Sequence, residues 1–150
     1  MSRYEKYFSF DISEDSSLFE FVSVGPKGEI KIVVQFTPTK TKHVFNLGFG
    51  NLQNDGTIDD HIVNDNKDRD KILATVAEIV FYFLSQYPNL TIGFTGSTEN
   101  RTRLYRMAIT LNYSELEQSF IIMGLTDSGA IEIFHQKKSY KAFFVKLKQP

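Results

Sequence analysis

The sequence predicts an α+β fold, with a largely antiparallel sheet of about six to seven strands and two helices packed on one face. Two observations carry this prediction. Short segments in which apolar and polar residues alternate recur along the chain and are separated by turn residues, as in half-buried strands. Two longer segments carry apolar residues at the three- and four-residue spacing of an amphipathic helix.

Length and composition are those of an ordinary globular domain. The 150 residues fit a single domain, and 41% of them are hydrophobic and 23% charged. A chain of this length buries a sizeable core without a disulfide or a metal ion. The 14 Phe and seven Tyr, with no Trp, predict a core rich in aromatic side chains.

Charge and cysteine content exclude some classes of protein. There are 17 basic and 18 acidic residues, so non-specific nucleic acid binding is not expected. Cysteine is absent, which removes disulfides and thiolate sites. No apolar run approaches the length of a membrane span, so we expect no membrane association, and a cytoplasmic location is the default.

The first third of the chain predicts an extended arm and three strands. Residues 1–16 mix aromatic and acidic side chains without a clear period, which favours an extended N-terminal arm. Strands are predicted at 18–24, at 30–36 and at 43–49, each bounded by turn residues. Because the connections are short, we expect these strands to form an antiparallel meander.

The segment 51–68 is the longest polar stretch and predicts a long acidic loop. It carries five aspartates, Asp55, Asp59, Asp60, Asp65 and Asp68. Carboxylates bind hard cations, but Lys67 and Arg69 occupy positions where a calcium-binding loop would need ligands. We therefore predict a solvated loop and no metal site; pairing of the loop with the arginines of the second helix remains an alternative.

The two helices are predicted at 70–87, ended by Pro88, and at 98–112. The first has a broad apolar stripe, formed by Ile72, Leu73, Val76, Ala77, Ile79, Val80, Phe83, Leu84 and Tyr87, with Thr75 on the opposite face. In the second, the inward stripe is expected to consist of Leu104, Met107, Ala108 and Leu111. A buried strand is predicted between the helices, at 90–94.

Three strands are predicted after the second helix. They lie at 120–125, at 131–134 and at 140–147. Asp127-Ser128-Gly129 forms a hairpin turn between the first two, and a second turn precedes the last.

The candidate site is the junction between the strand at 90–94 and the second helix. Ser97 is the expected N-cap, and Gly96 would let the backbone come close to a ligand. The unpaired backbone N–H groups of a helix N-terminus suit an anion. The P-loop lysine and the third glycine of a dinucleotide motif are both missing, so an ordinary capped helix is the alternative.

Three arginines follow this turn. At helical spacing, Arg101 and Arg103 flank the expected inward stripe on opposite sides, and Arg106 lies beside Arg103. Arg103 and Arg106 are therefore expected to bind the anion together, and Arg101 is expected to have a mainly structural role. The predicted anion site consists of Gly96, Ser97, Thr98, Arg101, Arg103 and Arg106. Alternatively, the arginines form ion pairs with the acidic loop or with Glu115 and Glu117.

No motif indicates catalysis. His43, His61 and His135 are far apart and lack the spacing of metal ligands, and no serine lies in a nucleophile elbow. The sequence therefore leaves enzymatic activity open, names no catalytic residue and predicts no cofactor.

Three stretches resemble a known family: Asn46-Leu47-Gly48-Phe49-Gly50, Lys71-Ile72-Leu73-Ala74-Thr75-Val76-Ala77, and Gly96-Ser97-Thr98 with Arg101-Thr102-Arg103-Leu104-Tyr105. The chain resembles a group of small uncharacterised proteins found chiefly in Bacteroidota and classed as a domain of unknown function. The resemblance covers most of the chain. It implies a bacterial, single-domain, cytoplasmic protein, and it brings no activity.

Two functions remain open from the sequence. The first is binding of a phosphate-bearing ligand, either a nucleotide or an RNA end, at residues 96–106. The second is a non-catalytic protein–protein interaction, as a homodimer or with a regulatory partner, in which the arginines and the acidic loop form complementary surfaces.

Overall fold

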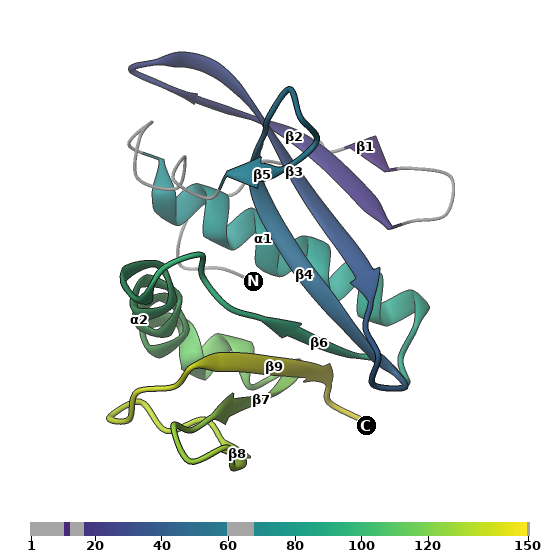
Figure 1. The fold of residues 1–150 in the computed structure, drawn as a ribbon, viewed down its shortest axis with the longest axis vertical. Helices are drawn as coiled ribbons and strands as arrows, with labels where there is room; N and C mark the ends of the chain where they lie inside the picture. The colour runs from purple at the N-terminus through teal and green to yellow at the C-terminus, as the bar shows by residue number, and fades with distance from the viewer. Residues whose placement is uncertain (1–10, 13–16, 60–67, 150) are drawn as a thin grey trace. The chain divides into compact units, whose positions relative to one another are not determined.

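The computed structural model describes residues 11–12, 17–59 and 68–149 (Figure 1). The chain divides into two compact units, which we name after their helices. The α1 unit comprises Ser2–Thr37 and Leu47–Phe83, and the α2 unit comprises Met1, Pro38–Asn46 and Leu84–Pro150. The predicted α+β class is confirmed, since two helices accompany strands that pair mostly antiparallel. That the whole chain forms one domain stays a prediction.

The α1 unit is built on a run of hydrogen-bonded strands in the order β1-β2-β3-β4, with β5 paired to β4. The elements are β1 (Asp11–Ile12), β2 (Leu18–Gly25), β3 (Gly28–Pro38), β4 (Val44–Leu52), β5 (Ile58–Asp59) and α1 (Arg69–Gln86). Strands β2 and β3 are antiparallel and in register from Leu18↔Gln35 to the Gly25↔Gly28 turn. The three strands predicted in this region are thus confirmed.

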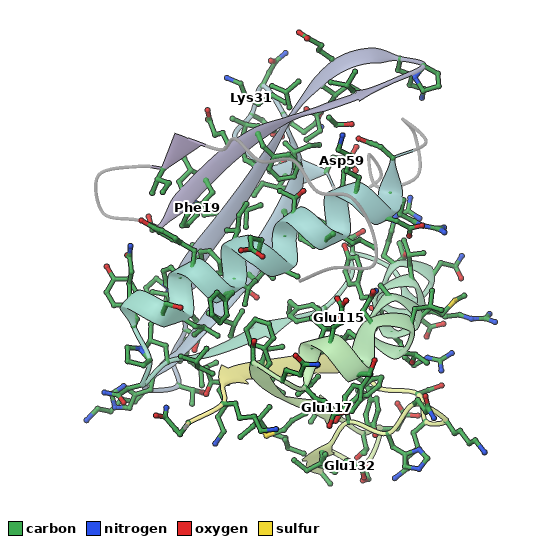
Figure 2. All side chains as sticks on the ribbon, turned by 180° about the vertical axis from the view of Figure 1, so that it is seen from behind. Phe19, Lys31, Asp59, Glu115, Glu117 and Glu132 are labelled. Atoms are coloured by element: carbon green, nitrogen blue, oxygen red, sulfur yellow. The ribbon has the colours of Figure 1, made fainter. Side chains whose placement is uncertain are left out.

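The core of the α1 unit is aromatic, as the composition predicts. The ring of Phe36 on β3 stacks on Phe83 of α1 with centroids 4.0 Å apart. Phe19 on β2 packs edge-on against Phe36 and against Tyr82, each at 5.8 Å. Figure 2 shows Phe19 directed from its strand toward α1. These contacts fix the helix against one face of the strands.

Helix α1 begins and ends within one residue of its predicted bounds. Six residues of its predicted apolar stripe are buried, namely Ile72, Val76, Ile79, Val80, Phe83 and Leu84, while Leu73 and Ala77 are half-buried. Two other residues differ from the prediction. Thr75 is fully buried, and its hydroxyl is satisfied because it donates to the carbonyl of Lys71 at 2.7 Å. Tyr87 was expected to face inward, but it lies beyond the last helical residue and is 40% exposed.

The predicted long loop is wrong for residues 51–59, which form a hairpin. Asn51 pairs with Asp59 across β4 and β5, and Gly56 closes the turn with a φ of 88°. The carboxylate of Asp55 accepts the Thr57 hydroxyl at 2.6 Å and its N–H at 3.0 Å, which lowers the pKa of Asp55. Local hydrogen bonds thus order what looked like a solvated segment.

The rest of the predicted acidic loop and the predicted N-terminal arm are only partly described by the structure. Asp68 accepts a hydrogen bond from the Ser23 hydroxyl at 2.7 Å, while Asp60 and Asp65 lie outside the described residues. Of the predicted N-terminal arm, 1–16, only Asp11–Ile12 is described, and it pairs with β2.

The α2 unit contains the strand order β4-β6-β9-β7-β8, in which β4 contributes its first residues. The further elements are β6 (Thr91–Phe94), α2 (Glu99–Leu116), β7 (Phe120–Leu125), β8 (Ile131–Ile133) and β9 (Ala142–Leu147). Strand β6 is parallel to β4 and antiparallel to β9, and β9 lies between β6 and β7 (Figure 1). The strands predicted after the second helix are confirmed, although the last begins two residues later than expected.

Helix α2 differs from its prediction in length and in its inward face. It continues to Leu116, four residues past the predicted end. Its buried residues are Tyr105 and Ile109, while Met107 and Leu111 are about half exposed. The physical reason is the packing of Tyr105, Ile109 and Tyr113, which lie four residues apart on one face of the helix. Tyr105 packs edge-on against Phe94 at 6.1 Å, and Tyr113 stacks on Phe134 at 5.6 Å.

Candidate functional site

An open cavity of about 510 Å³ lies within the α2 unit, at the start of α2. Five of the six residues of the predicted anion site line it, namely Gly96, Ser97, Thr98, Arg103 and Arg106. Arg101 is not among the lining residues. Arg103 and Arg106, which helical spacing places side by side, thus line one cavity, and Arg101 lies outside its lining.

Gly96 is required by the approach of the helix, and not only by a ligand. A Cβ atom at this position would lie 2.5 Å from both the Cβ of Arg101 and the backbone N of Thr102. The N–H of Gly96 donates to the Thr102 hydroxyl at 3.0 Å, which holds the turn against the first turn of α2. A side chain on residue 96 would push the helix away from β6.

The N-cap is Thr98, so the prediction of Ser97 as N-cap is wrong. Thr98 has extended dihedrals, φ −136° and ψ 166°, and its hydroxyl accepts the N–H of Arg101 at 3.2 Å. The first helical hydrogen bond runs from Thr102 N–H to Thr98 carbonyl, at 3.0 Å. The hydrogen bond from Gly96 N–H to the Thr102 hydroxyl holds Gly96 and Ser97 in the turn before the helix, so α2 begins one residue later than predicted.

The cap leaves part of the first turn available to a ligand. Within the described part of the chain, no acceptor binds the backbone N–H of Glu99 or of Asn100. Unpaired N–H groups at a helix start carry the positive end of the helix dipole. Of these two residues, Glu99 lines the cavity.

The two arginines that line the cavity, Arg103 and Arg106, form few contacts with other described side chains or backbone groups. Arg103 is exposed, and its guanidinium group makes no ion pair or hydrogen bond with the described residues. Arg106 directs one guanidinium nitrogen at the carbonyl of Gln136, at 3.5 Å. Neither arginine pairs with Glu115 or Glu117, so the ion-pair alternative is not seen for these two side chains among the described residues.

Four lining residues were not predicted as residues of the site. Asp127 lies in the turn after β7, and Ser139, Tyr140 and Lys141 precede β9. They reach the helix start because β9 pairs with β6, Phe94↔Phe143, and with β7, Leu125↔Ala142. Such pairings are long-range, and no local pattern in the sequence encodes them.

Thr95, Glu99 and Thr102 complete the lining. The hydroxyl of Thr95 donates to the carbonyl of Lys141 at 2.7 Å and lies 3.2 Å from the Thr102 hydroxyl. One threonine therefore ties the turn before α2 to the segment before β9. The two sides of the cavity are joined directly.

A side-chain network holds the segment that carries Tyr140. The carboxylate of Glu132 on β8, labelled in Figure 2, accepts the Tyr140 hydroxyl at 2.8 Å, and both of its oxygens lie 2.9 Å from Lys138 Nζ. The Tyr140 oxygen accepts in turn the N–H of His135 at 3.0 Å. Since Gly124 has no side chain, the Tyr140 ring packs directly on the backbone of β7; a Cβ there would overlap the ring.

These contacts change the titration of all three groups. The hydrogen bond from Lys138, followed by that from Tyr140, lowers the pKa of Glu132. The same bond raises the pKa of Lys138. Burial, and then the hydrogen bond to Glu132, raises the pKa of Tyr140. At neutral pH the network therefore consists of an ionised carboxylate, an ammonium group and a neutral phenol.

The described residues contain no group of three or more histidine or acidic side chains placed to hold a metal ion. Neither helix of the described chain is long and apolar enough to cross a membrane. The residues that line the cavity carry cations, hydroxyls and carboxylates.

Fold and site together define an α+β protein with a polar cavity at the start of its second helix. The chain belongs to a family of unknown function, DUF6934, whose model matches residues 3–148. Neither the curated proteins nor the solved structures contain a match to this chain. The membership agrees with the family class that the sequence resembles, and it carries no activity.

Proposed function

We propose that the protein binds a phosphate-bearing ligand, such as a nucleotide or an RNA end, in the cavity at the start of α2. One observation carries the proposal: Arg103 and Arg106 line the same cavity as the turn Gly96-Ser97-Thr98. Guanidinium groups bind phosphate through forked donors, and helix N-termini bind anions through backbone N–H groups. Both kinds of donor converge on one space.

In this proposal, the N–H groups of Glu99 and Asn100 and the hydroxyls of Ser97 and Thr98 hold the phosphate oxygens. The arginines neutralise its charge, and Lys141 adds a third cation from the other side. Glu99 and Asp127 also line the cavity and offset two of these three charges. Binding therefore depends on the placement of the donors more than on net charge.

A thermal-shift titration with phosphate-bearing compounds tests the proposal. A ligand at about 100 times its Kd stabilises by about 2.7 kcal/mol, which for a chain of this size raises Tm by roughly 5–10 °C. Arg103→Gln should reduce this shift because it removes a cation that contacts the ligand. Lys146→Gln on β9 removes the same charge away from the cavity and serves as the control.

The proposal fails if no phosphate compound, inorganic phosphate included, raises Tm. It also fails if Arg103→Gln and Lys146→Gln bind the ligand equally well. The further expectation that the protein acts in the bacterial cytoplasm rests on the resemblance to proteins of Bacteroidota.

A second candidate function is protein–protein interaction, as a homodimer or with a regulatory partner. It is favoured by β8, the last strand of its sheet order, which exposes Ile131 and Ile133 by 57% and 60%. Exposed apolar residues on an edge strand are typical of interaction sites. A protein that stays monomeric at high concentration, and captures no partner, would count against this candidate.

A further inference from the structure

We infer that the ligand of this cavity is a phosphorylated polyhydroxy compound of the sugar phosphate class, and not a nucleotide. The inference rests on the proposed function, because it assumes that the arginine side of the cavity receives the phosphate. It is carried by the size of the cavity, by the kind of residues that line it and by two carboxylates.

The size of the cavity calls for more than a phosphate group. Its volume of about 510 Å³ lies within the range of small-molecule sites, roughly 300–1,000 Å³. The rest of the ligand must therefore also match the lining.

The lining offers no surface for a nucleobase. Its residues include no aliphatic side chain, and Tyr140 is the one aromatic residue among those that line the cavity in the described chain. The Tyr140 side chain is only 6% exposed, because its ring packs on Gly124 and against Phe134 and Phe143 at 5.6 and 6.2 Å. Proteins recognise bases by stacking them on open aromatic or guanidinium faces. The guanidinium groups of Arg103 and Arg106 bind the phosphate in the proposed function, so no open face is left for a base.

The two carboxylates in the lining match hydroxyl groups. The carboxylates of Glu99 and Asp127 form no hydrogen bond or ion pair with any described residue. An ionised carboxylate only accepts hydrogen bonds and repels a phosphate, so the ligand must present donors to it. The hydroxyls of a sugar are such donors, and they accompany the phosphate in one small molecule.

Asp127 is the more informative of the two, because it comes from a different element than the arginines. Its turn is held by the Thr126 hydroxyl, which accepts the N–H of Ala130 at 3.1 Å, and by the Gly129 N–H, which donates to the Thr126 carbonyl at 3.0 Å. These hydrogen bonds fix the backbone of the turn that carries the Asp127 carboxylate. The cavity therefore combines cations from α2 with an acceptor from the β7–β8 turn.

Isothermal titration with ribose 5-phosphate, AMP and inorganic phosphate tests the inference. Ribose 5-phosphate and AMP share the phosphorylated sugar and differ mainly in the base. We expect ribose 5-phosphate to bind at least about tenfold more tightly than AMP and than inorganic phosphate. Unphosphorylated ribose should bind at least as weakly as inorganic phosphate.

The variants separate the two halves of the ligand. Asp127→Asn should weaken ribose 5-phosphate about tenfold, the equivalent of one charge-assisted hydrogen bond, without weakening inorganic phosphate. Arg103→Gln should weaken both. Asp70→Asn on α1 changes the same charge in the other unit and should affect neither.

Each other outcome is informative. If AMP binds as tightly as ribose 5-phosphate, or if Asp127→Asn behaves like Asp70→Asn, the inference is overturned while the proposed function stands. If no phosphate compound binds, the proposed function itself is lost.

Discussion

At the scale of single residues, the site depends on a position where no side chain fits. Gly96 lies so close to α2 that a Cβ atom would meet the Cβ of Arg101 and the backbone of Thr102. Sequence reasoning singled out Gly96, but for access of a ligand to the backbone. The structure gives the packing of the helix start as its first role.

Gly96→Ala should lower the free energy of unfolding by about 1–3 kcal/mol, the usual cost of overpacking. Gly48→Ala is the matched control, because its Cβ would meet only Ile58 Cδ1 at an ordinary 3.8 Å. The control should change stability by no more than about 0.5 kcal/mol. Equilibrium urea unfolding measures both; equal stabilities of the two variants would contradict the packing argument.

The residues of the proposed anion site show what the sequence could and could not predict. Helical periodicity placed Arg103 and Arg106 together because the spacing of residues on a helix is fixed. The N-cap was missed by one residue, since both Ser97 and Thr98 have the required hydroxyl and a contact with Thr102 decides between them. No local sequence pattern marked Asp127 and Lys141 as residues of the site, because only the pairing of the strands brings them to the cavity.

At the scale of elements, the segment between β8 and β9 is ordered by side chains. The network of Glu132, Tyr140 and Lys138 closes this segment and presents Tyr140 to the cavity. The pKa of Glu132 is lowered, so its contribution to stability is present above its ordinary value of 4.5 and is lost as pH falls through its folded value. The pKa values of Lys138 and Tyr140 are raised, so their contributions are lost only above pH 10.

Glu132→Ala should therefore lower Tm by an amount that is constant between about pH 5 and 9 and that shrinks at lower and at higher pH. Glu132→Gln keeps an acceptor for Tyr140 but loses the charge that attracts Lys138, so it should lower Tm less. Glu29→Gln on β3 controls for the change in net charge. Calorimetry across the pH range measures all three; a difference in Tm that grows in acid would refute the role of the network.

The two helices show which features a local sequence pattern predicts and which it does not. The bounds of α1 were predicted to within a residue because its broad apolar stripe ends at Pro88. The inward face of α2 was wrong because its sequence offers two apolar faces of similar strength. Packing of Tyr105 on Phe94 and of Tyr113 on Phe134 selects one of them, and Met107 and Leu111 are left on the outside.

At the scale of the whole molecule, three elements belong to both compact units. Strands β3 and β4 and helix α1 each begin in one unit and end in the other. The sequence predicted the longer strands of both units and the neighbouring order of β2, β3 and β4, but it predicted neither β1 nor β5. It also did not predict the strand order of the α2 unit or the parallel pairing of β4 with β6. That pairing joins Val44 to Thr91, residues far apart in the chain, and only the folded structure relates them.

We expect the chain to unfold in one cooperative transition, because unfolding either unit would break an element of the other. Ile32→Val and Ile92→Val test this, since both residues are fully buried and lie one in each unit. Each should cost about 0.5–1.5 kcal/mol.

Each substitution should shift the transition by the same amount whether it is followed by circular dichroism or by tyrosine fluorescence. Tyr105, Tyr113 and Tyr140 all lie in the α2 unit and weight the second signal toward it. Separate transitions would show that the units unfold independently and would count against a single domain.

The hydroxyl of Thr95, which binds the carbonyl of Lys141 and lies beside the Thr102 hydroxyl, has a consequence for the energetics of recognition. It joins the two sides of the cavity before any ligand arrives, so the cost of ordering them is met during folding. A ligand then loses affinity mainly through its own immobilisation. Association should accordingly be fast, with little rearrangement of the backbone around the cavity.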